Sequence, residues 1–374
     1  MTTDQGKIAL DFSQWPISPS TSRRRRPMAE GEEGISCCGL LFRCCYWLCP
    51  PCPTSMANKL AFHPPPKGLF YKLYEYPAYH SNVEDLKDVE DGRRLGIRLL
   101  FPYIIKSHLR MATENVEAFV VRSSRGNRLV GTLYRPDKLL NSNEVILFSN
   151  PNSMDLGQNL YPSLAYIQRL GAILGMDVFS YDYSGYGYSE GSPSEKNLYS
   201  DIEAVYAKIR QLRPNQKIVL VGVSLGTCPS AHMAAQNPAS LAGLVMVSGF
   251  SSGLPLICGT RPSGSPSCLD HFCTVHKIPK IEVPILFIHG ELDTLISIKH
   301  SELMHSLAKK PTHPLWICDA NHQNIFLHCD VIPRINRFIS RELGPIVSQP
   351  QAITISYSSR VNQPRQGDSN LEIL

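Results

Sequence analysis

The sequence predicts an α/β protein with a mostly parallel central sheet flanked by helices. Between residues 118 and 343, short apolar runs alternate with amphipathic segments, which is typical of β-α-β units. One of these runs is followed by a Gly-x-Ser-x-Gly sequence, and acidic and imidazole side chains follow later runs. With 374 residues, of which 43% are hydrophobic, the chain is long enough to bury a full core.

Two kinds of strand are expected in this region. Residues 118–124 and 128–136 flank Gly126-Asn127 and predict an antiparallel hairpin. Buried strands are predicted for the apolar runs Glu144–Asn150, Met176–Asp182, Lys217–Gly222, Leu241–Gly249, Val283–Gly290 and His313–Asp319.

The segments between the strands predict helices and one irregular insertion. From Ser194 to Leu212, apolar residues recur at three- and four-residue spacing, which predicts an amphipathic helix. Residues 251–280 are rich in Gly, Pro, Ser and Cys and interrupt the alternation of strands and helices. We expect this insertion to lie over the site as a lid.

The ends of the chain differ in composition from its body. Residues 1–36 form a polar leader and residues 344–374 a polar tail, both expected to be disordered. Residues 37–67 hold a cysteine-rich segment and a proline-rich connector, and residues 68–117 approach the domain of residues 118–343. The net charge of +5 is modest and includes the run Arg23–Arg26, so we predict no nucleic-acid partner.

Ser224 is the predicted nucleophile. It stands in GVSLG, directly after the apolar run Lys217–Gly222 and before the small-residue segment TCPSAHMAAQ. Glycines two residues before and after a serine permit the tight strand-to-helix turn on which a nucleophilic hydroxyl projects. The alternative is a structural serine in a turn.

A serine nucleophile requires an oriented base, so an acid and a histidine are expected after later strands. Asp293 follows the run Val283–Gly290, and His322 follows the run His313–Asp319. The chain order Ser, Asp, His is that of α/β-hydrolases. Glu291 is the alternative acid and His328 the alternative base.

Other polar residues near these runs have expected structural roles. A core imidazole is predicted for His289, solvent exposure for Asp270 and His271, and surface or packing roles for His232 and His300. The tyrosine-rich segment Tyr181–Gly191 is predicted to be a packed, glycine-shaped turn, with a rim for the substrate as the alternative.

Backbone N–H groups are expected to stabilise the oxyanion of an acyl-transfer reaction. One comes from the residue after the nucleophile, Leu225, and the other from the loop of residues 149–158, where Asn152 is the predicted donor.

Several of these segments together resemble a known family. The segments SNPNSMDLGQ, FSYDYSGYGYSEGSPSEKNLYSDI, GVSLGT and HGELDTLIS, and the cysteine block followed by MANKLAFHPPP, are similar to the alpha/beta-hydrolase domain-containing protein 17 family of protein depalmitoylases. The resemblance runs from about Cys37 to Leu343. It implies a serine hydrolase that removes palmitate from cysteines of membrane-associated proteins, with Ser224, Asp293 and His322 as its triad.

The resemblance also implies placement and partners. The expected partners are S-palmitoylated proteins, the expected location is the cytoplasmic face of the plasma membrane and endosomal membranes, and a monomer without metal or organic cofactor is expected. The family usually has His-Gly where this chain has Asn150-Pro151. Because proline lacks an N–H, a differently shaped oxyanion loop is expected. A lipid or small-ester hydrolase and a catalytically weakened scaffold remain as alternatives.

The cysteine-rich segment has three possible uses: disulfides, a metal site or acylation. Cys49 and Cys52 have C-x-x-C spacing, but the adjacent pairs lack the usual spacing of zinc ligands. The sequence contains no run of about 18 to 20 uninterrupted apolar residues that would span a bilayer. The apolar part of the cysteine-rich segment is short and interrupted by Arg43, so a secretion signal is not expected and disulfides are disfavoured. Clustered thiols beside Leu, Phe, Tyr and Trp therefore predict S-palmitoylation, at Cys37, Cys38, Cys44, Cys45, Cys49 and Cys52.

Overall fold

A computed structural model describes residues 58, 61–75, 82–84, 86, 89, 95–100, 113–140, 143–161, 164–258, 262 and 270–344. Contacts divide the chain into two units, Met1–Pro51 and Cys52–Leu374, and all described residues belong to the second. The six predicted acylation sites and the polar ends lie outside the described residues. Within them, none of the helices combines the length and the apolar character that crossing a bilayer requires.

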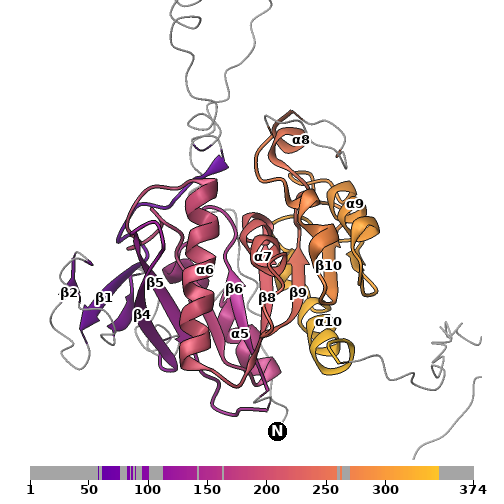
Figure 1. Cartoon of the computed structure of the whole chain (residues 1–374). Coiled ribbons are helices and arrows are strands. Elements are labelled where there is room, and N and C mark those ends of the chain that lie inside the picture. The colour runs from indigo at the N-terminus through magenta and orange to yellow at the C-terminus, as the bar shows by residue number, and fades with distance from the viewer. Residues whose placement is uncertain are drawn as a thin grey trace, which may run out of the picture. The chain divides into compact units, whose positions relative to one another are not determined.

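The centre of the fold is one mixed sheet (Figure 1), with the strand order β11-β10-β9-β8-β6-β7-β5-β4-β3-β1-β2. From β11 to β7 the neighbouring strands pair in parallel, and from β7 to β2 they pair antiparallel. The strands are β1 Tyr71–Glu75, β2 Asn82–Val83, β3 Leu95–Leu99, β4 Val116–Arg122, β5 Arg128–Tyr134, β6 Glu144–Ser149, β7 Val178–Tyr181, β8 Lys217–Val223, β9 Leu241–Val247, β10 Ile285–Gly290 and β11 Leu315–Ile317.

Helices cover both faces of the sheet, with α6 and α7 in front of it in the view of Figure 1. The α-helices are α4 Leu156–Asn159, α5 Tyr166–Leu174, α6 Glu195–Leu212, α7 Thr227–Ala234, α8 Gly253–Cys258, α9 Lys299–Leu307 and α10 Val331–Arg337. Short helical turns are η3 Ser224–Gly226, η4 Thr274–His276, η5 Ile278–Lys280, η6 Ile325–Leu327 and η7 Phe338–Glu342. One apolar cluster lies beneath α5 and α10, and a second beneath α6, α7 and α9.

The predicted α/β fold is confirmed, and so is the burial of its predicted strands except the last, because β11 lies at the edge of the sheet and only Ile317 of its three residues is buried. Each of the six apolar runs contains a strand, and β8 is buried at all but its first residue, as a strand with helices on both faces must be. The predicted hairpin also forms, since β4 and β5 pair antiparallel from Val116↔Tyr134 to Arg122↔Arg128. The helix predicted for Ser194–Leu212 is α6, and the Ser194 side chain caps it by accepting a hydrogen bond from the Asn197 N–H at 3.1 Å.

The sheet continues further toward the N-terminus than the sequence indicated. Strands β1, β2 and β3 lie in the approach segment of residues 68–117 and extend the antiparallel side of the sheet. The pattern of β1, YKLYE, places Tyr71 and Leu73 in the core and leaves Lys72 between them half-buried. Such a short amphipathic strand has a weak sequence signal, which explains why it was not predicted.

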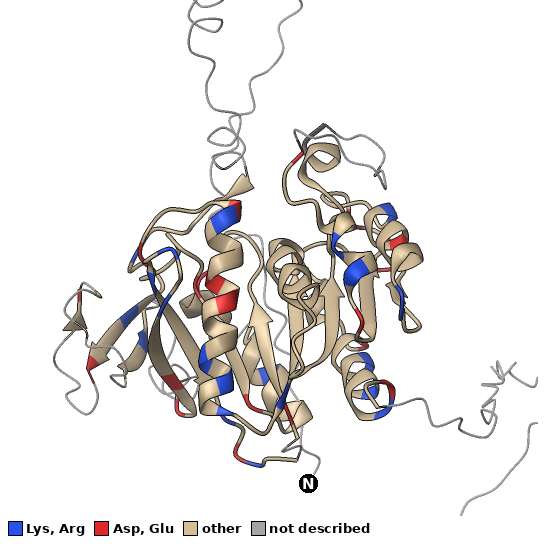
Figure 2. Cartoon of the chain, viewed as in Figure 1, with Lys and Arg blue, Asp and Glu red and all other residues tan. Residues whose placement is uncertain are grey.

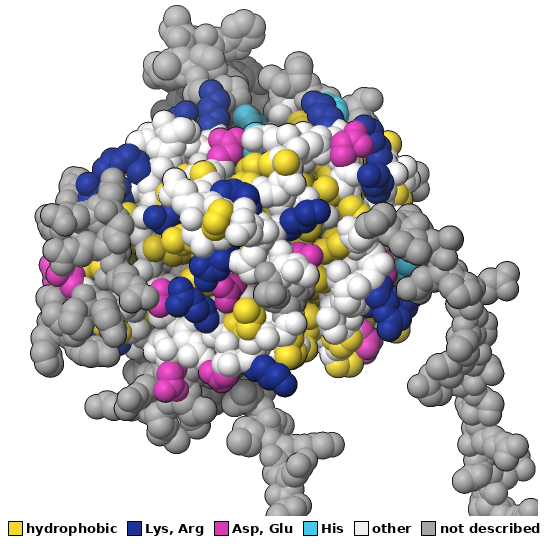
Figure 3. Space-filling view, turned by 60° about the horizontal axis from the view of Figure 1, so that its bottom comes forward, with side chains coloured by type: hydrophobic (Ala, Val, Ile, Leu, Met, Phe, Trp, Pro, Cys, Tyr) yellow, Lys and Arg dark blue, Asp and Glu magenta, His cyan; other side chains and the backbone are white. Residues whose placement is uncertain are grey.

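Charged side chains are distributed over the helices and loops. In Figure 2, α6 carries both basic and acidic side chains, whereas strands β9 and β10 carry neither and β8 carries only Lys217, at its exposed first position. The face shown in Figure 3 likewise has small groups of both signs, separated by uncharged and hydrophobic side chains. A mixed distribution of this kind does not favour binding of a polyanion on these faces.

Candidate active site

Ser224 lies on a sharp turn between β8 and α7. Its φ of 52° is in the left-handed region, which is unusual for a residue other than glycine. The two glycines of GVSLG are required by close packing, because a Cβ on Gly222 would lie 2.4 Å from the Gly226 carbonyl oxygen and a Cβ on Gly226 would lie 2.2 Å from the Ser149 carbonyl oxygen. The sequence thus forms the strained turn expected of a nucleophile elbow.

The structure brings Ser224, His322 and Asp293 together, although they are far apart in the sequence. The Ser224 Oγ lies 3.0 Å from His322 Nε2, and His322 Nδ1 lies 2.7 Å from Asp293 Oδ2. With Nδ1–H donating to the carboxylate, Nε2 is the lone-pair nitrogen and accepts from the serine hydroxyl. This geometry can remove the hydroxyl proton as the oxygen attacks an acyl group.

The surroundings of Asp293 keep its carboxylate charged. Burial raises the pKa of Asp293, but hydrogen bonds from His289, His322 and the Ile296 N–H outweigh burial and hold the pKa below its ordinary value. One oxygen, Oδ1, accepts from the N–H groups of Leu295 and Ile296 at 3.0 and 2.8 Å. The carboxylate is therefore fixed in place and available to orient His322.

His289 is in the core, as predicted, but it also contacts the site. It is fully buried, and its Nε2 lies 2.8 Å from the Ile296 carbonyl oxygen and 3.4 Å from Asp293 Oδ2. Its Nδ1 lies 2.7 Å from the hydroxyl of Ser301. A histidine that closes a buried strand is equally consistent with packing alone, so the sequence carried no signal for this contact.

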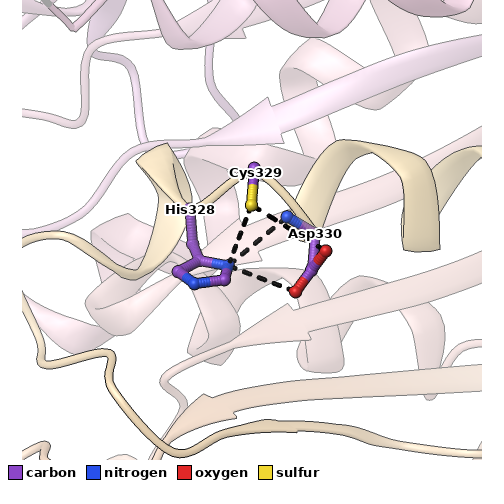
Figure 4. A group of neighbouring side chains, drawn as sticks. All are labelled: His328, Cys329 and Asp330. Carbon is purple, nitrogen blue, oxygen red and sulfur yellow. Dashed lines mark hydrogen bonds and ion pairs between the residues drawn. The ribbon is translucent and has the colours of Figure 1, made fainter. Parts of the chain in front are cut away.

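The alternative acid and base lie elsewhere. Glu291 is exposed, whereas Asp293 is buried. His328 forms a surface cluster with its neighbours Cys329 and Asp330 (Figure 4), and its Nε2 lies 3.3 Å from Asp319 Oδ1. These three consecutive side chains could bring metal-ligating atoms within 4.8 Å of one another, but none of them lines the cavity at Ser224.

A cavity of about 830 Å³ opens in front of Ser224. This volume is within the range of about 300–1,000 Å³ that is common for small-molecule sites. His322, Leu225 and Asn152 line it together with Ser224. Most of the remaining lining is apolar or aromatic, and includes Met154, Tyr166, Phe250, Leu254, Leu256, Phe272, Leu295, Ile296, Ile325 and Phe326.

The two residues predicted to supply oxyanion donors, Leu225 and Asn152, thus lie on the same cavity as the serine. In the same loop as Asn152, Asn150 is buried and has a structural role. Its Nδ2 donates to the Tyr181 carbonyl at 3.1 Å, and its Oδ1 accepts from the Asn159 Nδ2 at 2.6 Å. Pro151 lines the cavity. Asn150 therefore anchors the loop of residues 149–158 to β7 and α4. The loop still lines the cavity at Ser224 although it contains Pro151.

The lid-like insertion is partly described, and one expectation for it is wrong. It begins with α8 and ends with η4 and η5. Asp270 and His271 were expected to face solvent, but both line the cavity. Both residues are partly exposed: Asp270 Oδ1 accepts from the Leu254 N–H at 2.7 Å, and His271 Nδ1 lies 3.2 Å from Glu195 Oε2.

The tyrosine-rich segment is a packed turn, as predicted. Tyr181, Tyr183 and Tyr186 are buried, and Gly185 and Gly187 adopt φ values of 81° and 50°. The sequence did not indicate that this turn would contact the oxyanion loop. The Tyr183 hydroxyl donates to the Asn150 carbonyl at 2.5 Å.

Comparisons with known proteins agree with this fold. A family described as alpha/beta hydrolase fold matches residues 149–261. The chain is 35% identical over 346 residues to alpha/beta hydrolase domain-containing protein aho-3 of Caenorhabditis elegans, covering 91% of this chain and 94% of that protein. It is also 35% identical over 307 residues to human alpha/beta hydrolase domain-containing protein 17B, covering 80% and 96%.

Among solved structures, the Pyrococcus furiosus esterase Pf2001 has a TM-score of 0.50 at 16% identity, covering 66% of this chain and 98% of the esterase chain. That likeness extends to the fold alone. The two relatives align over most of both chains at an identity that establishes common family membership. The chain therefore belongs to the alpha/beta hydrolase domain-containing protein 17 family, and it is a hydrolase-fold enzyme.

Proposed function

We propose that this protein is a serine hydrolase that removes palmitate from S-acylated cysteines of membrane-associated proteins, through an acyl-serine intermediate. The observation that carries the proposal is the position of Ser224, in contact with His322 and at the wall of a largely apolar cavity. An apolar cavity favours a long acyl chain over a charged or sugar-like substrate. The family resemblance, rather than the geometry, favours a protein thioester over a small ester.

In the proposed reaction, His322 Nε2 takes the hydroxyl proton as Ser224 Oγ forms a bond to the thioester carbonyl carbon. The carbonyl oxygen becomes an oxyanion, which the N–H groups of Leu225 and Asn152 stabilise. Breaking the carbon–sulfur bond expels the cysteine sulfur, which takes the proton from the imidazolium. A water molecule, deprotonated by His322, then attacks the acyl-serine carbonyl; the bond from the acyl carbon to Ser224 Oγ breaks, the oxygen takes the proton back from the imidazolium, and the fatty acid is released.

Asp293 orients the base in this scheme. Its carboxylate accepts from His322 Nδ1 and so keeps Nε2 free to receive the serine proton. Because the pKa of Asp293 lies below its ordinary value, the carboxylate stays ionised at neutral pH and stabilises the imidazolium that forms.

Attachment to membranes completes the proposal. Cys37, Cys38, Cys44, Cys45, Cys49 and Cys52 are proposed S-palmitoylation sites, located before the described part of the chain. One acyl chain binds a bilayer only marginally, whereas two or more give stable attachment. Modified cysteines would place the enzyme on the cytoplasmic face of the plasma membrane and endosomal membranes, where its palmitoylated protein substrates lie.

Hydrolysis assays with three substrates test this function. Purified full-length protein and its Ser224→Ala variant are given an S-palmitoylated peptide, a soluble short-chain ester and a monoacylglycerol. We expect wild-type protein to release palmitate from the peptide and Ser224→Ala to release none. Hydrolysis of the small ester or the monoacylglycerol alone would instead identify a lipid or small-ester hydrolase, and no hydrolysis of any of the three would identify a scaffold.

A further inference from the structure

The side chain of Asn152 is fully engaged by groups from three segments of the chain. Its Oδ1 accepts from the Tyr186 hydroxyl at 2.7 Å, from the His63 N–H at 3.1 Å and from the Ser153 N–H at 3.0 Å. Its Nδ2 donates to the Ala61 carbonyl at 2.8 Å. The proposed role of Asn152 in oxyanion stabilisation needs only its backbone N–H. Its amide side chain is nevertheless held in place by these contacts.

The first partner of Asn152 is the segment Ala61–His63, which we name the N-terminal strap. Ala61 and His63 line the cavity beside Ser224. Phe62, between them, is only 6% exposed, and its ring packs against those of Phe272 and Tyr186 with centroids 5.6 and 6.5 Å apart. The strap is thus held in the core by its middle residue and bound to the oxyanion loop by its backbone.

The second partner is the tyrosine-rich turn. The Tyr186 hydroxyl reaches the side chain of Asn152, and the Tyr183 hydroxyl reaches the backbone carbonyl of Asn150. Both tyrosines are buried, and their rings contact each other edge to face, with centroids 5.5 Å apart. Two rigid phenols therefore support the loop at positions on either side of Pro151.

We propose that Tyr186 and the N-terminal strap are positioning elements of the oxyanion loop, acting through the side chain of Asn152. This inference rests on the proposed function, because it assumes that the Asn152 N–H meets the oxyanion. Donors stabilise a transition state when they are held in place before the reaction, and small displacements of such groups reduce rates strongly. Asn152 lies in a loop without sheet partners, so its side-chain contacts provide the positional restraint that a strand would otherwise give.

The variant Tyr186→Phe tests this inference in the full-length protein. It removes one hydroxyl and keeps the buried ring. We expect kcat for a soluble ester to fall about tenfold with KM changed less than about twofold, because the loss is confined to the transition state. An alkyl trifluoromethyl ketone forms an oxyanion on Ser224, so its affinity is expected to fall by about the same factor as kcat. The affinity for a fatty acid, which forms no such oxyanion, is expected to stay unchanged.

Tyr206→Phe is the matched control. It removes another hydroxyl of a largely buried tyrosine, which lies 2.8 Å from the Ser240 Oγ and does not line the cavity. We expect this variant to keep wild-type kcat. Equal kcat for the two Phe variants, or a rise in KM with unchanged kcat for Tyr186→Phe, would overturn the inference.

A double-mutant cycle separates positioning through Asn152 from a general loss of packing. If Tyr186 acts through the amide, Asn152→Ala and the double variant Asn152→Ala/Tyr186→Phe will have the same kcat. Additive losses would contradict the inference. His63→Pro, which deletes the N–H that the strap donates to Asn152, is expected to lower kcat in the wild-type background and not in Asn152→Ala; additive losses here would exclude the strap.

Thermal unfolding of every variant checks that the fold is retained. The proposed function and this inference fail in different ways. If Ser224→Ala retains esterase activity, the proposed function is wrong. If Ser224→Ala is inactive and Tyr186→Phe behaves like Tyr206→Phe, only the positioning inference is wrong.

Discussion

Asp293 Oδ2 lies 2.7 Å from Nδ1 of His322, with the carboxylate buried beneath the imidazole. Glu291, two residues earlier, is exposed to solvent. Both acids follow the same strand, β10, and the turn after the strand decides which of them faces the base. The N–H groups of Leu295 and Ile296 hold the carboxylate of Asp293 in that position.

The two acids should therefore differ sharply on substitution. We expect Asp293→Asn to lower kcat for a soluble ester by about 10³- to 10⁴-fold, because the amide no longer fixes the tautomer of His322. Glu291→Gln should stay within about twofold of wild type, because the Glu291 side chain is exposed and does not line the cavity. Steady-state rates of both variants check this assignment, and a comparable loss in Glu291→Gln would contradict it.

Gly226 is required by the turn that carries Ser224. A Cβ there would meet backbone oxygen of Ser149 at 2.2 Å, and backbone cannot move as a side-chain end can. We expect Gly226→Ala to lower the free energy of unfolding by about 3 kcal/mol or more and to abolish labelling by a fluorophosphonate probe. Gly344→Ala is the control, since nothing lies within 4 Å of its added methyl group, and it should change the unfolding free energy by less than about 0.5 kcal/mol.

His300 makes the fold sensitive to acid. Burial, together with the neighbouring imidazole of His289, lowers the pKa of His300 to about 4, although the nearby carboxylate of Asp293 acts in the opposite direction. Its Nδ1 accepts from the Ser251 N–H at 3.2 Å and so must be unprotonated in the folded protein. Because the pKa is about 6.5 in the unfolded chain, stability is present above about pH 6.5 and is lost as the pH falls toward 4.

His300→Asn tests that dependence. Asparagine offers an oxygen close to the position of Nδ1 and does not titrate. Denaturant unfolding between about pH 6.5 and pH 4 should show that the free energy of unfolding falls less steeply with decreasing pH in the variant. The difference between the two slopes should correspond to close to one bound proton. An unchanged slope would show that the acid sensitivity arises at another group.

The strands and the elbow could be predicted because their signals are local. The run KIVLVG is apolar throughout and is followed by GVSLG, so a buried strand and a tight turn are specified within ten residues or so. The order of Ser224, Asp293 and His322 along the chain then follows from the order of the strands. Their mutual contact depends on the parallel pairing of β8, β9, β10 and β11, which the alternation of strands and helices predicts.

Features that depend on distant contacts could not be predicted. The strap reaches Asn152 across 89 residues of sequence, and Tyr186 reaches it across 34. Asp270 lines the cavity and accepts from the Leu254 N–H, a contact that the spacing of apolar residues does not predict. Composition correctly indicated a tightly packed tyrosine turn but not which loop it would support.

The proposed membrane attachment through six acylated cysteines should be separable from the chemistry. If these cysteines carry the acyl chains that hold the protein on the bilayer, changing Cys37, Cys38, Cys44, Cys45, Cys49 and Cys52 to serine should move it to the cytosol. Hydrolysis of a soluble ester should be unchanged, since the body of the protein keeps Ser224, Asp293 and His322. Fractionation and esterase assays check the two expectations, and continued membrane residence would mean that another segment attaches the protein.

The most direct measurement is mass spectrometry of the acyl-enzyme. Full-length protein is mixed with an S-palmitoylated peptide, quenched in acid at short times and digested. We predict a palmitoyl group on the peptide that contains Ser224, formed at the same rate as the free peptide thiol and missing in Ser224→Ala. Thiol release without acylation of Ser224, or with the palmitoyl group on another residue, would contradict the proposed mechanism.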